Sequence, residues 1–324
     1  MTDELAAAVV GCGGAGANHA VGYERAGGAE LVGVCDLDPE RADALAAERD
    51  VPAYLDLAEL LDDQRPDLVS VATDEYHHVE PTVTALEGGA DVLCEKIPAH
   101  SLEGAREMVR VAERTGRALG VDYNYRHMPA YRTVREAVDA GELGDVHLLS
   151  AEAHCFGWHH ALDLVTFLMG TPETASATLD DEQAARPYDW SETDELLYVP
   201  SHGVSATFRY GDGTMATVDS TMHTDLGEHL VDLSVYGEAG SVRLDGATPE
   251  DSTGDVQPGP LADRVRGLER VTLEEAFHRS VAPFVDARRS GEAPPTTGRD
   301  GLRVMRLENA VVRSARAAEQ VAVA

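Results

Sequence analysis

The sequence of 324 residues has almost no lysine. Lysine and arginine together number 26, and 26 − 1 = 25 of them are arginine. The single lysine, Lys96, follows a short apolar run at 92–94 and Glu95. Most lysines are solvated surface charges, so chance placement is the alternative. Lysine is nonetheless a compact charge whose pKa shifts readily, whereas arginine stays charged. Because α/β folds bind ligands where strands end, we expect Lys96 to carry chemistry.

Basic side chains are few beside the 58 acidic ones, and the formal net charge is 26 − 58 = −32. A charge of this sign repels nucleic acids and anionic membranes, so neither is an expected partner. The acidic residues are spread along the chain rather than gathered in a tail. Salt screens such self-repulsion, since the Debye length falls to about 3 Å at 1 M. We therefore expect a halophile's protein whose structure depends on molar salt.

Aromatic residues, cysteines and long apolar runs are also scarce. Aromatic residues make up 5% of the chain, so its cores should consist mainly of Val, Leu and Ala. The four cysteines lie far apart without a CxxC pair, which is typical of buried thiols in a reducing compartment. No apolar run approaches the roughly 20 residues that span a bilayer, and the acidic start does not resemble a signal peptide. These features favour the cytoplasm.

A glycine-rich turn follows the first apolar segment. The stretch 11–16 fits the pattern G-x-G-x-x-G, and a helix is predicted at 17–26. In this pattern Gly11 permits a tight turn, Gly13 lets the backbone approach a pyrophosphate, and Gly16 lets the helix pack on the strand. The helix N-terminus adds free N–H groups and partial positive charge. We predict a dinucleotide-binding loop formed by Gly11, Cys12, Gly13, Gly14, Ala15 and Gly16.

An acidic residue ends the second apolar segment. Asp36 lies 20 residues after Gly16, where a carboxylate should meet the adenosine ribose hydroxyls, with Leu37 beside it. A carboxylate there repels a 2′-phosphate and favours NAD, whereas Arg41 leaves NADP possible. The alternative is that Asp36 is the N-cap of a helix at 39–48.

Strand-like and helix-like segments alternate up to residue 122. Strands are expected at 67–73, 91–94 and from 119, and helices at 79–87 and after Ser101. This alternation predicts a parallel, doubly wound sheet, and therefore an NAD-binding Rossmann domain over 1–122. The carboxyl ends of parallel strands share one edge of a sheet. We expect the nicotinamide beside the residues that end these strands, which are Thr73, His77, His78, Glu95 and Lys96.

The pattern changes after residue 122. A helix is expected at 129–140 and a strand at 146–154, and later alternating segments indicate β-strands with a turn at 211–213. Helices are expected at 274–289 and 299–318. We predict a substrate-binding α/β domain over 123–324. Tyr188 and Trp190, in an acidic stretch, either stack on a sugar or hold a loop in place.

These residues together resemble the glucose–fructose oxidoreductase / inositol dehydrogenase / MocA family. The resemblance rests on the glycine loop, Asp36, the Glu95-Lys96 pair, the Asn-Tyr-Arg at 124–126 and the stretch 297–303, and it spans nearly the whole chain. It implies a Rossmann domain, a C-terminal α/β domain with an open, mostly antiparallel sheet, no metal, and a homodimer or homotetramer. It also implies hydride transfer between NAD(P) and a hydroxyl-bearing carbon of a sugar, polyol, inositol or sugar-derived substrate.

The resemblance also implies roles for individual residues. Lys96 is expected to contact both the cofactor and the substrate oxygen. His160 is the expected general base, and Asp163 lies three residues later on the same helical face. The other expected substrate-side residues are Asn124, Tyr125, Arg126, Trp158 and His159.

The sequence departs from the family at two places. The family has Glu-Lys-Pro, whereas Ile97 separates Lys96 from the proline here. The family also has an Asp four residues before the catalytic histidine, where this chain has Phe156 before His160, and Cys155 before His159. Either Asp163 or His159 orients the base, or the histidine works alone, or the usual chemistry is lost.

Other interpretations stay open for these histidines and for the function. The two histidines could be structural. A zinc site is the other alternative, although the spacing matches no closed pattern; its candidate ligands are His154, Cys155, His159, His160 and Asp163. A redox-neutral NAD-dependent glycosidase or lyase would oxidise a ring carbon transiently without accumulating NADH. A non-catalytic sensor would bind dinucleotide and sugar without turnover. The missing Asp favours the sensor, and the retained Lys96 opposes it.

Overall fold

The computed structural model describes residues 4–180, 203–223, 230–244 and 273–323, together with 261, 264–265 and 268. The chain divides into two compact units, one of Met1–Asn124 with Glu274–Leu302 and one of Tyr125–Leu273 with Arg303–Ala324. Two continuous domains with a boundary at 122 were predicted. In the structure the first boundary between the units lies two residues later, after Asn124, and residues 274–302 belong again to the first unit. Tyr188 and Trp190 lie outside the described residues.

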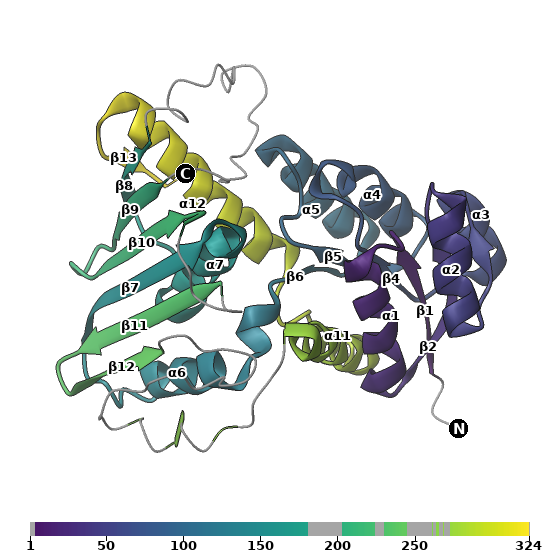
Figure 1. Cartoon of the computed structure of the whole chain (residues 1–324), viewed down its shortest axis with the longest axis horizontal. Coiled ribbons are helices and arrows are strands. Elements are labelled where there is room, and N and C mark those ends of the chain that lie inside the picture. The colour runs from purple at the N-terminus through teal and green to yellow at the C-terminus, as the bar shows by residue number, and fades with distance from the viewer. Residues whose placement is uncertain are drawn as a thin grey trace. The chain divides into compact units, whose positions relative to one another are not determined.

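Within 4–124 the first unit contains a parallel sheet in the order β3-β2-β1-β4-β5-β6 (Figure 1). Strands β4, β5 and β6 are buried along their whole length, because helices cover both faces. This strand order is that of a doubly wound dinucleotide-binding fold and confirms the predicted Rossmann domain. The strands are β1 (Leu5–Val10), β2 (Ala29–Cys35), β3 (Ala53–Tyr54), β4 (Leu68–Val71), β5 (Asp91–Glu95) and β6 (Leu119–Asp122).

The helices of the first unit begin at side-chain caps in several places. Ser101 Oγ accepts the N–H of Gly104 at 3.1 Å, which starts α5 where the sequence predicted. Asp56 caps α3 in the same way. The pair β3 and α3 was not predicted, because a strand of two residues is too short to show alternation. The helices are α1 (Gly14–Ala26), α2 (Pro39–Arg49), α3 (Leu57–Gln64), η1 (Glu75–His77), α4 (Val79–Glu87), α5 (Leu102–Thr115) and α11 (Leu273–Ser290).

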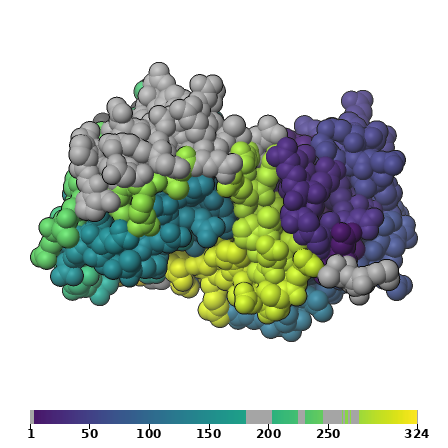
Figure 2. Space-filling model, turned by 90° about the horizontal axis from the view of Figure 1, so that it is seen from below, coloured from purple at the N-terminus to yellow at the C-terminus, as the bar shows by residue number. Residues whose placement is uncertain are grey.

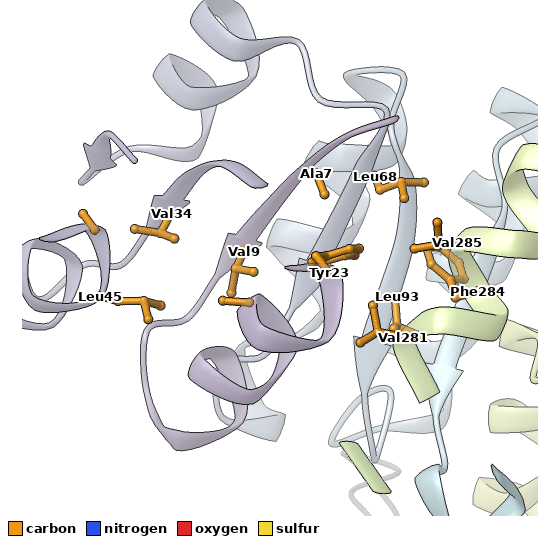
Figure 3. Close-up of a cluster of buried hydrophobic side chains, with 12 residues drawn as sticks. Ala7, Val9, Tyr23, Val34, Leu45, Leu68, Leu93, Val281, Phe284 and Val285 are labelled. Carbon is orange, nitrogen blue, oxygen red and sulfur yellow. The ribbon is translucent and has the colours of Figure 1, made fainter. Parts of the chain in front are cut away.

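Helix α11 belongs to the first unit because its apolar face completes the core there. Val281, Phe284 and Val285 are buried in a cluster with Val9, Tyr23 and Leu93 (Figure 3). A Cβ placed on Gly22 of α1 would lie 2.7 Å from Val281 Cγ2. Helices α1 and α11 therefore pack side by side, as both views show (Figures 1 and 2).

The second unit contains a mixed sheet in the order β12-β11-β7-β10-β9-β8-β13. Among its described strands, β7 and β10 pair in parallel and the other neighbours are antiparallel, as predicted. The strands are β7 (Val146–His154), β8 (Thr174–Leu179), β9 (Val204–Arg209), β10 (Met215–Thr221), β11 (Val231–Gly237), β12 (Gly240–Leu244) and β13 (Val321–Ala322).

Helix α7 (Trp158–Met169) packs against β7, β10 and β11 of this sheet, accompanied by α6 (Pro129–Asp139) and α12 (Gly298–Ala317). Ten of the twelve residues of α7 are buried, so it forms the centre of the unit. Among the helices that the structure describes, none combines the length and apolar composition that a membrane crossing needs.

The sheet surface formed by the alternate, outward residues of β7 and its neighbours is acidic. Glu152 in β7 pairs in register with Asp232 in β11 and with Asp219 in β10. Ala151 and Ala153, on either side of Glu152, are buried. Three carboxylates thus lie in one row across three strands.

Candidate active site

The polar residues predicted at the strand ends follow neighbouring strands of the Rossmann sheet. Gly11 follows β1, Asp36 follows β2, Thr73 follows β4, and Lys96 follows β5. Because these strands are parallel and adjacent in the order β2-β1-β4-β5, the four positions share one edge of the sheet. The carboxyl-terminal edge of the sheet therefore carries these residues together, as the sequence predicted.

The glycine loop fits a dinucleotide pyrophosphate. Gly11 has φ +93°, and a Cβ there would lie 2.5 Å from the carbonyl oxygen of Ala72. A Cβ on Gly16 would lie 1.8 Å from the oxygen of Gly11, so both positions require glycine. Gly13 caps α1 without a side-chain hydrogen bond, and added Cβ atoms at Gly13 and Gly14 would meet nothing within 4 Å. The first N–H groups of α1 thus face open space.

Asp36 holds the glycine loop in place. Its Oδ2 accepts the N–H of Cys12 at 2.7 Å, and its Oδ1 accepts the N–H of Asp38 at 2.9 Å. Burial, helped by the charge of Asp36, raises the pKa of the Cys12 thiol to about 12, so Cys12 stays neutral. The N-cap of α2 is Asp38, whose carboxylate accepts the N–H of Glu40. The N-cap alternative for Asp36 was therefore wrong.

Leu37 and Arg41 lie on the outer side of this turn. Leu37 is 89% exposed, and Arg41 Nε lies 3.5 Å from Asp38 Oδ2. These positions are compatible with contacts to the adenosine part of a dinucleotide.

Lys96 is half-buried, and hydrogen bonds hold its main chain. Its backbone N–H donates to Glu95 Oε2 at 3.0 Å. The following peptide bond, to Ile97, is cis. The carbonyl oxygen of Ile97 lies 2.7 Å from Nδ1 of buried His78, whose Nε2 lies 3.1 Å from the carbonyl oxygen of Thr73. Burial lowers the pKa of His78, and a neutral ring can donate to only one of these two carbonyl oxygens.

A buried polar cluster lies behind Glu95. His19 Nε2 is 3.1 Å from Glu95 Oε1 and 3.2 Å from Asp122 Oδ2. His19 Nδ1 is 2.9 Å from Ser70 Oγ, and Ser280 Oγ donates to Asp122 Oδ2 at 2.9 Å. Both oxygens of Glu95 thus have protein partners, and its contact with the cofactor stays a prediction.

Sequence reasoning missed His19 and Asp122. A histidine within the first helix and an acid at the end of a buried strand were the available indications. In the described part of the chain, His19, Glu95 and Asp122 are the group whose metal-ligand atoms all lie within 4.8 Å of one another. The zinc site that the sequence left open lay elsewhere, among residues 154–163.

In the second unit His160 lies at the start of α7. It is buried, and its ring stacks on Tyr125 with centroids 4.2 Å apart and an angle of 11°. Burial raises the pKa of Tyr125 well above its usual range, so the phenol stays neutral. Phe156, where the family has the Asp, is 52% exposed.

Asp163 and Arg126 form a buried ion pair. Arg126 Nε donates to both carboxylate oxygens, at 2.9 and 2.7 Å, and its Nη2 donates to Oδ1 at 2.6 Å. Arg126 also lies over the ring of Phe167, at 5.1 Å from its centroid. Asp163, one of the two groups expected to orient the base, and the predicted substrate-binding arginine therefore neutralise each other.

The remaining predicted residues divide into two groups. His159 Nε2 lies 3.0 Å from Glu308 Oε1 of α12, with both side chains buried, and Trp158 is fully buried. The burial of His159 and Trp158 favours a structural role for both over the predicted contact with substrate. Asn124, in η2 (Asn124–His127), is also buried, but its Oδ1 has no hydrogen-bond partner among the described residues. The substrate contact of Asn124 stays a prediction.

Two family models match the chain. The oxidoreductase family, NAD-binding Rossmann fold, matches residues 5–123, and its C-terminal α/β domain matches 156–323. The chain belongs to the Gfo/Idh/MocA oxidoreductase family. The predicted family, fold class and NAD cofactor are thereby confirmed.

Similar proteins span nearly the whole chain. Inositol 2-dehydrogenase of Rubrobacter xylanophilus is 28% identical over 307 residues, covering 90% of this chain and 85% of that protein. 1,5-Anhydro-D-fructose reductase of Ensifer adhaerens is 27% identical over 320 residues, covering 91% of each. An oxidoreductase of Agrobacterium radiobacter, solved with NAD⁺, L-tartaric acid and magnesium, has a TM-score of 0.80 at 22% identity, covering 99% of this chain and 98% of that one. At this identity, the similarity to the Agrobacterium structure shows a shared fold and nothing more.

Proposed function

We propose that this oxidoreductase transfers a hydride between NAD and a hydroxyl-bearing carbon of a sugar, polyol or sugar-derived substrate. The observation that carries the proposal is the single lysine of the chain at the same sheet edge as a glycine loop shaped for a dinucleotide. The two relatives named above, an inositol dehydrogenase and an anhydrofructose reductase, support the substrate class.

The residues of this chain handle the proton and the substrate oxygen. NAD, when bound, supplies the hydride acceptor or donor. The ammonium group of Lys96 donates a charge-assisted hydrogen bond to the substrate oxygen, worth ~2–4 kcal/mol if it acts like an oxyanion donor. His160 removes or returns the hydroxyl proton, since an imidazole nitrogen can act as a general base or acid.

Tyr125 supports the proposed base in place of the family's carboxylate. Its ring lies parallel to that of His160 at stacking distance. Such aromatic pairs contribute roughly 0.5–1.5 kcal/mol beyond the burial of their area. The stack restricts rotation of the imidazole, which is one task of an orienting carboxylate. Tyr125→Phe should therefore preserve turnover better than Tyr125→Ala.

Turnover by purified protein tests the function. In molar KCl, absorbance at 340 nm would be followed with NAD or NADP and a panel of sugars, inositols and sugar acids. We expect NAD to be preferred because Asp36 lies beside the glycine loop. Lys96→Ala should lower kcat by about 10²–10³ while NAD binding is kept. Arg106→Ala, which removes a half-buried cation from α5, is the matched control.

Three outcomes would contradict the proposal or parts of it. Unchanged turnover in Lys96→Ala would remove Lys96 from the chemistry. Substrate consumption that needs NAD but never accumulates NADH would identify the redox-neutral glycosidase or lyase. Binding of NAD and a sugar without any turnover would identify a sensor.

The proposal extends to the setting of the protein. The net charge of −32 supports a halophile's cytoplasm, and the resemblance supports a homodimer or homotetramer. Light scattering after size-exclusion chromatography in molar KCl measures the oligomer. A monomer under those conditions would contradict this part.

A further inference from the structure

The peptide unit that joins Lys96 to Ile97 is flanked by two buried side chains. On one side Glu95 Oε2 accepts the backbone N–H of Lys96, and on the other His78 lies 2.7 Å from the carbonyl oxygen of Ile97. Glu95 is 6% exposed and His78 is 1% exposed. The main chain of the lysine is therefore fixed by groups that water does not reach.

The glutamate is itself held by a helix that starts at the glycine loop. His19, in the second turn of α1, is fully buried and contacts Glu95 Oε1 through Nε2. Strand β5 and helix α1 are thereby joined by a side-chain contact in addition to their packing. An ionised Glu95 without His19 would lose its buried hydrogen-bonding partner at Oε1 and keep only Lys96 as a compensating group.

The protons in the cluster can be placed consistently. With a proton on each nitrogen, His19 donates through Nδ1 to Ser70 Oγ, and through Nε2 toward Glu95 and Asp122. Ser280 Oγ donates to Asp122 Oδ2 at 2.9 Å, so this carboxylate accepts from both His19 and Ser280. Burial raises the pKa of Asp122 and outweighs these two donors, which lower it.

We infer that His19, Glu95 and His78 are positioning residues that set the place of Lys96 through its main chain. The inference rests on the catalytic role proposed for Lys96. The contacts lie on opposite sides of the peptide unit, so losing either one frees the lysine to shift. A displacement of about 1 Å at a reacting group can cost 10²-fold in rate.

The single lysine makes this inference directly measurable. Labelling with ¹⁵N-lysine gives one backbone amide signal, that of Lys96, in the full-length protein. In the wild type we expect this amide to exchange slowly with solvent. In His19→Leu, exchange should be at least about tenfold faster and kcat at least about tenfold lower, with KM for NAD within about twofold. His19→Gln keeps a donor toward Glu95, so its amide exchange rate and its kcat should lie between those of the wild type and of His19→Leu.

Tyr23→Phe is the matched control within the same cluster. It removes a hydroxyl that lies 2.9 Å from Ser70 Oγ, but it leaves the contacts of Glu95 in place. We expect its Tm to fall while the Lys96 amide and kcat stay at wild-type values. A merely structural role of His19 would make His19→Leu behave like Tyr23→Phe, which would overturn the inference.

Glu95 variants decide the question if His19→Leu does not fold. Glu95→Gln keeps an oxygen for the N–H of Lys96 and should keep this amide protected from exchange. Glu95→Ala removes that oxygen, so it should expose the amide and lower kcat below that of Glu95→Gln. Equal amide exchange in these two variants would overturn the inference. A stoichiometric metal ion that is present in the wild type and lost in His19→Gln would also overturn it. Failure of the wild type to turn over any substrate would instead refute the proposed function, since the amide signal needs no substrate.

Discussion

At the scale of single residues, several buried charges in the described part of the chain have partners of opposite sign. His19 lies between Glu95 and Asp122, Arg126 is bonded to Asp163, and His159 to Glu308. In a low-dielectric interior an isolated charge costs far more than a paired one. Each of these contacts is therefore more sensitive to loss of one partner than to loss of both.

The pH dependence of stability should report the charge of His19. Burial lowers the pKa of His19, but Asp122 and Glu95 outweigh burial and raise it to about 10. In the unfolded chain it is about 6.5. The folded state therefore binds the proton more tightly, and the stabilisation is full below pH about 6.5 and lost as pH rises through about 10. We expect the difference in free energy of unfolding between wild type and His19→Gln to shrink over this interval in denaturant titrations. A constant difference would contradict the assigned charge.

Removing the carboxylate of Asp163 should be costly. Asp163→Ala leaves the guanidinium of Arg126 buried and unneutralised, which predicts a loss of about 3–5 kcal/mol in the free energy of unfolding. The double variant Arg126→Met with Asp163→Leu should lose less, because no charge is left behind. Arg110→Ala, which breaks an exposed pair with Glu103, is the control and should cost less than about 1 kcal/mol. Denaturant titrations in molar KCl measure all three.

At the scale of elements, helix α11 is the segment whose place matters most for the first unit. It begins 273 − 122 = 151 residues after the end of β6, yet it closes one face of the Rossmann sheet beside α1. Residues 274–302 therefore form part of the nucleotide-binding unit although the chain has meanwhile built the second unit. Truncation at residue 124 would leave this apolar face in water.

Loss of one α11 side chain should destabilise the first unit. Phe284 is 1% exposed, and a Cβ on Gly120 of β6 would lie 3.2 Å from its ring. Phe284→Ala should lower the free energy of unfolding by about 3–5 kcal/mol through lost burial and a cavity. Asp286→Ala, on the exposed side of the same helix, should change it by less than about 0.5 kcal/mol. Equal effects of the two variants would mean that α11 does not carry this core.

At the scale of the whole molecule, acidity governs the response to salt. The net charge is −32, and the described part of the second sheet includes the row Asp232, Glu152 and Asp219. Like charges directly opposite each other on neighbouring strands are destabilising. At molar salt the Debye length is about 3 Å, so this repulsion is largely screened. The whole protein should therefore lose stability steadily on dilution from molar KCl.

Neutralising the middle of the acidic row should show this effect locally. Glu152→Gln should raise the free energy of unfolding in dilute buffer by roughly 0.2–1 kcal/mol, and the gain should vanish in molar KCl. Glu113→Gln is the control, because Glu113 is bonded to Arg299 and its loss should bring no gain. Thermal unfolding at several salt concentrations measures both. A gain in Glu152→Gln that is independent of salt would have another cause.

Local spacing in the sequence was enough to locate most elements. The strand at 146–154 and the helix at 79–87 have the predicted bounds, because periodicity and the residues that end helices act over a few neighbours. The glycine loop, Asp36 and Lys96 could be placed on one edge for the same reason, since parallel strands carry their ends to the same side.

The partners of the buried charges could not be predicted this way. His19 in α1 and Asp122 at the end of β6 are separated by 122 − 19 = 103 residues. They meet because the fold brings α1 to the end of β6, which is the edge strand opposite β3. Asp163 has the right helical spacing to serve His160, yet its carboxylate binds Arg126, 37 residues away. Spacing along the chain determines which face a side chain occupies, whereas packing of distant elements determines the group it meets there.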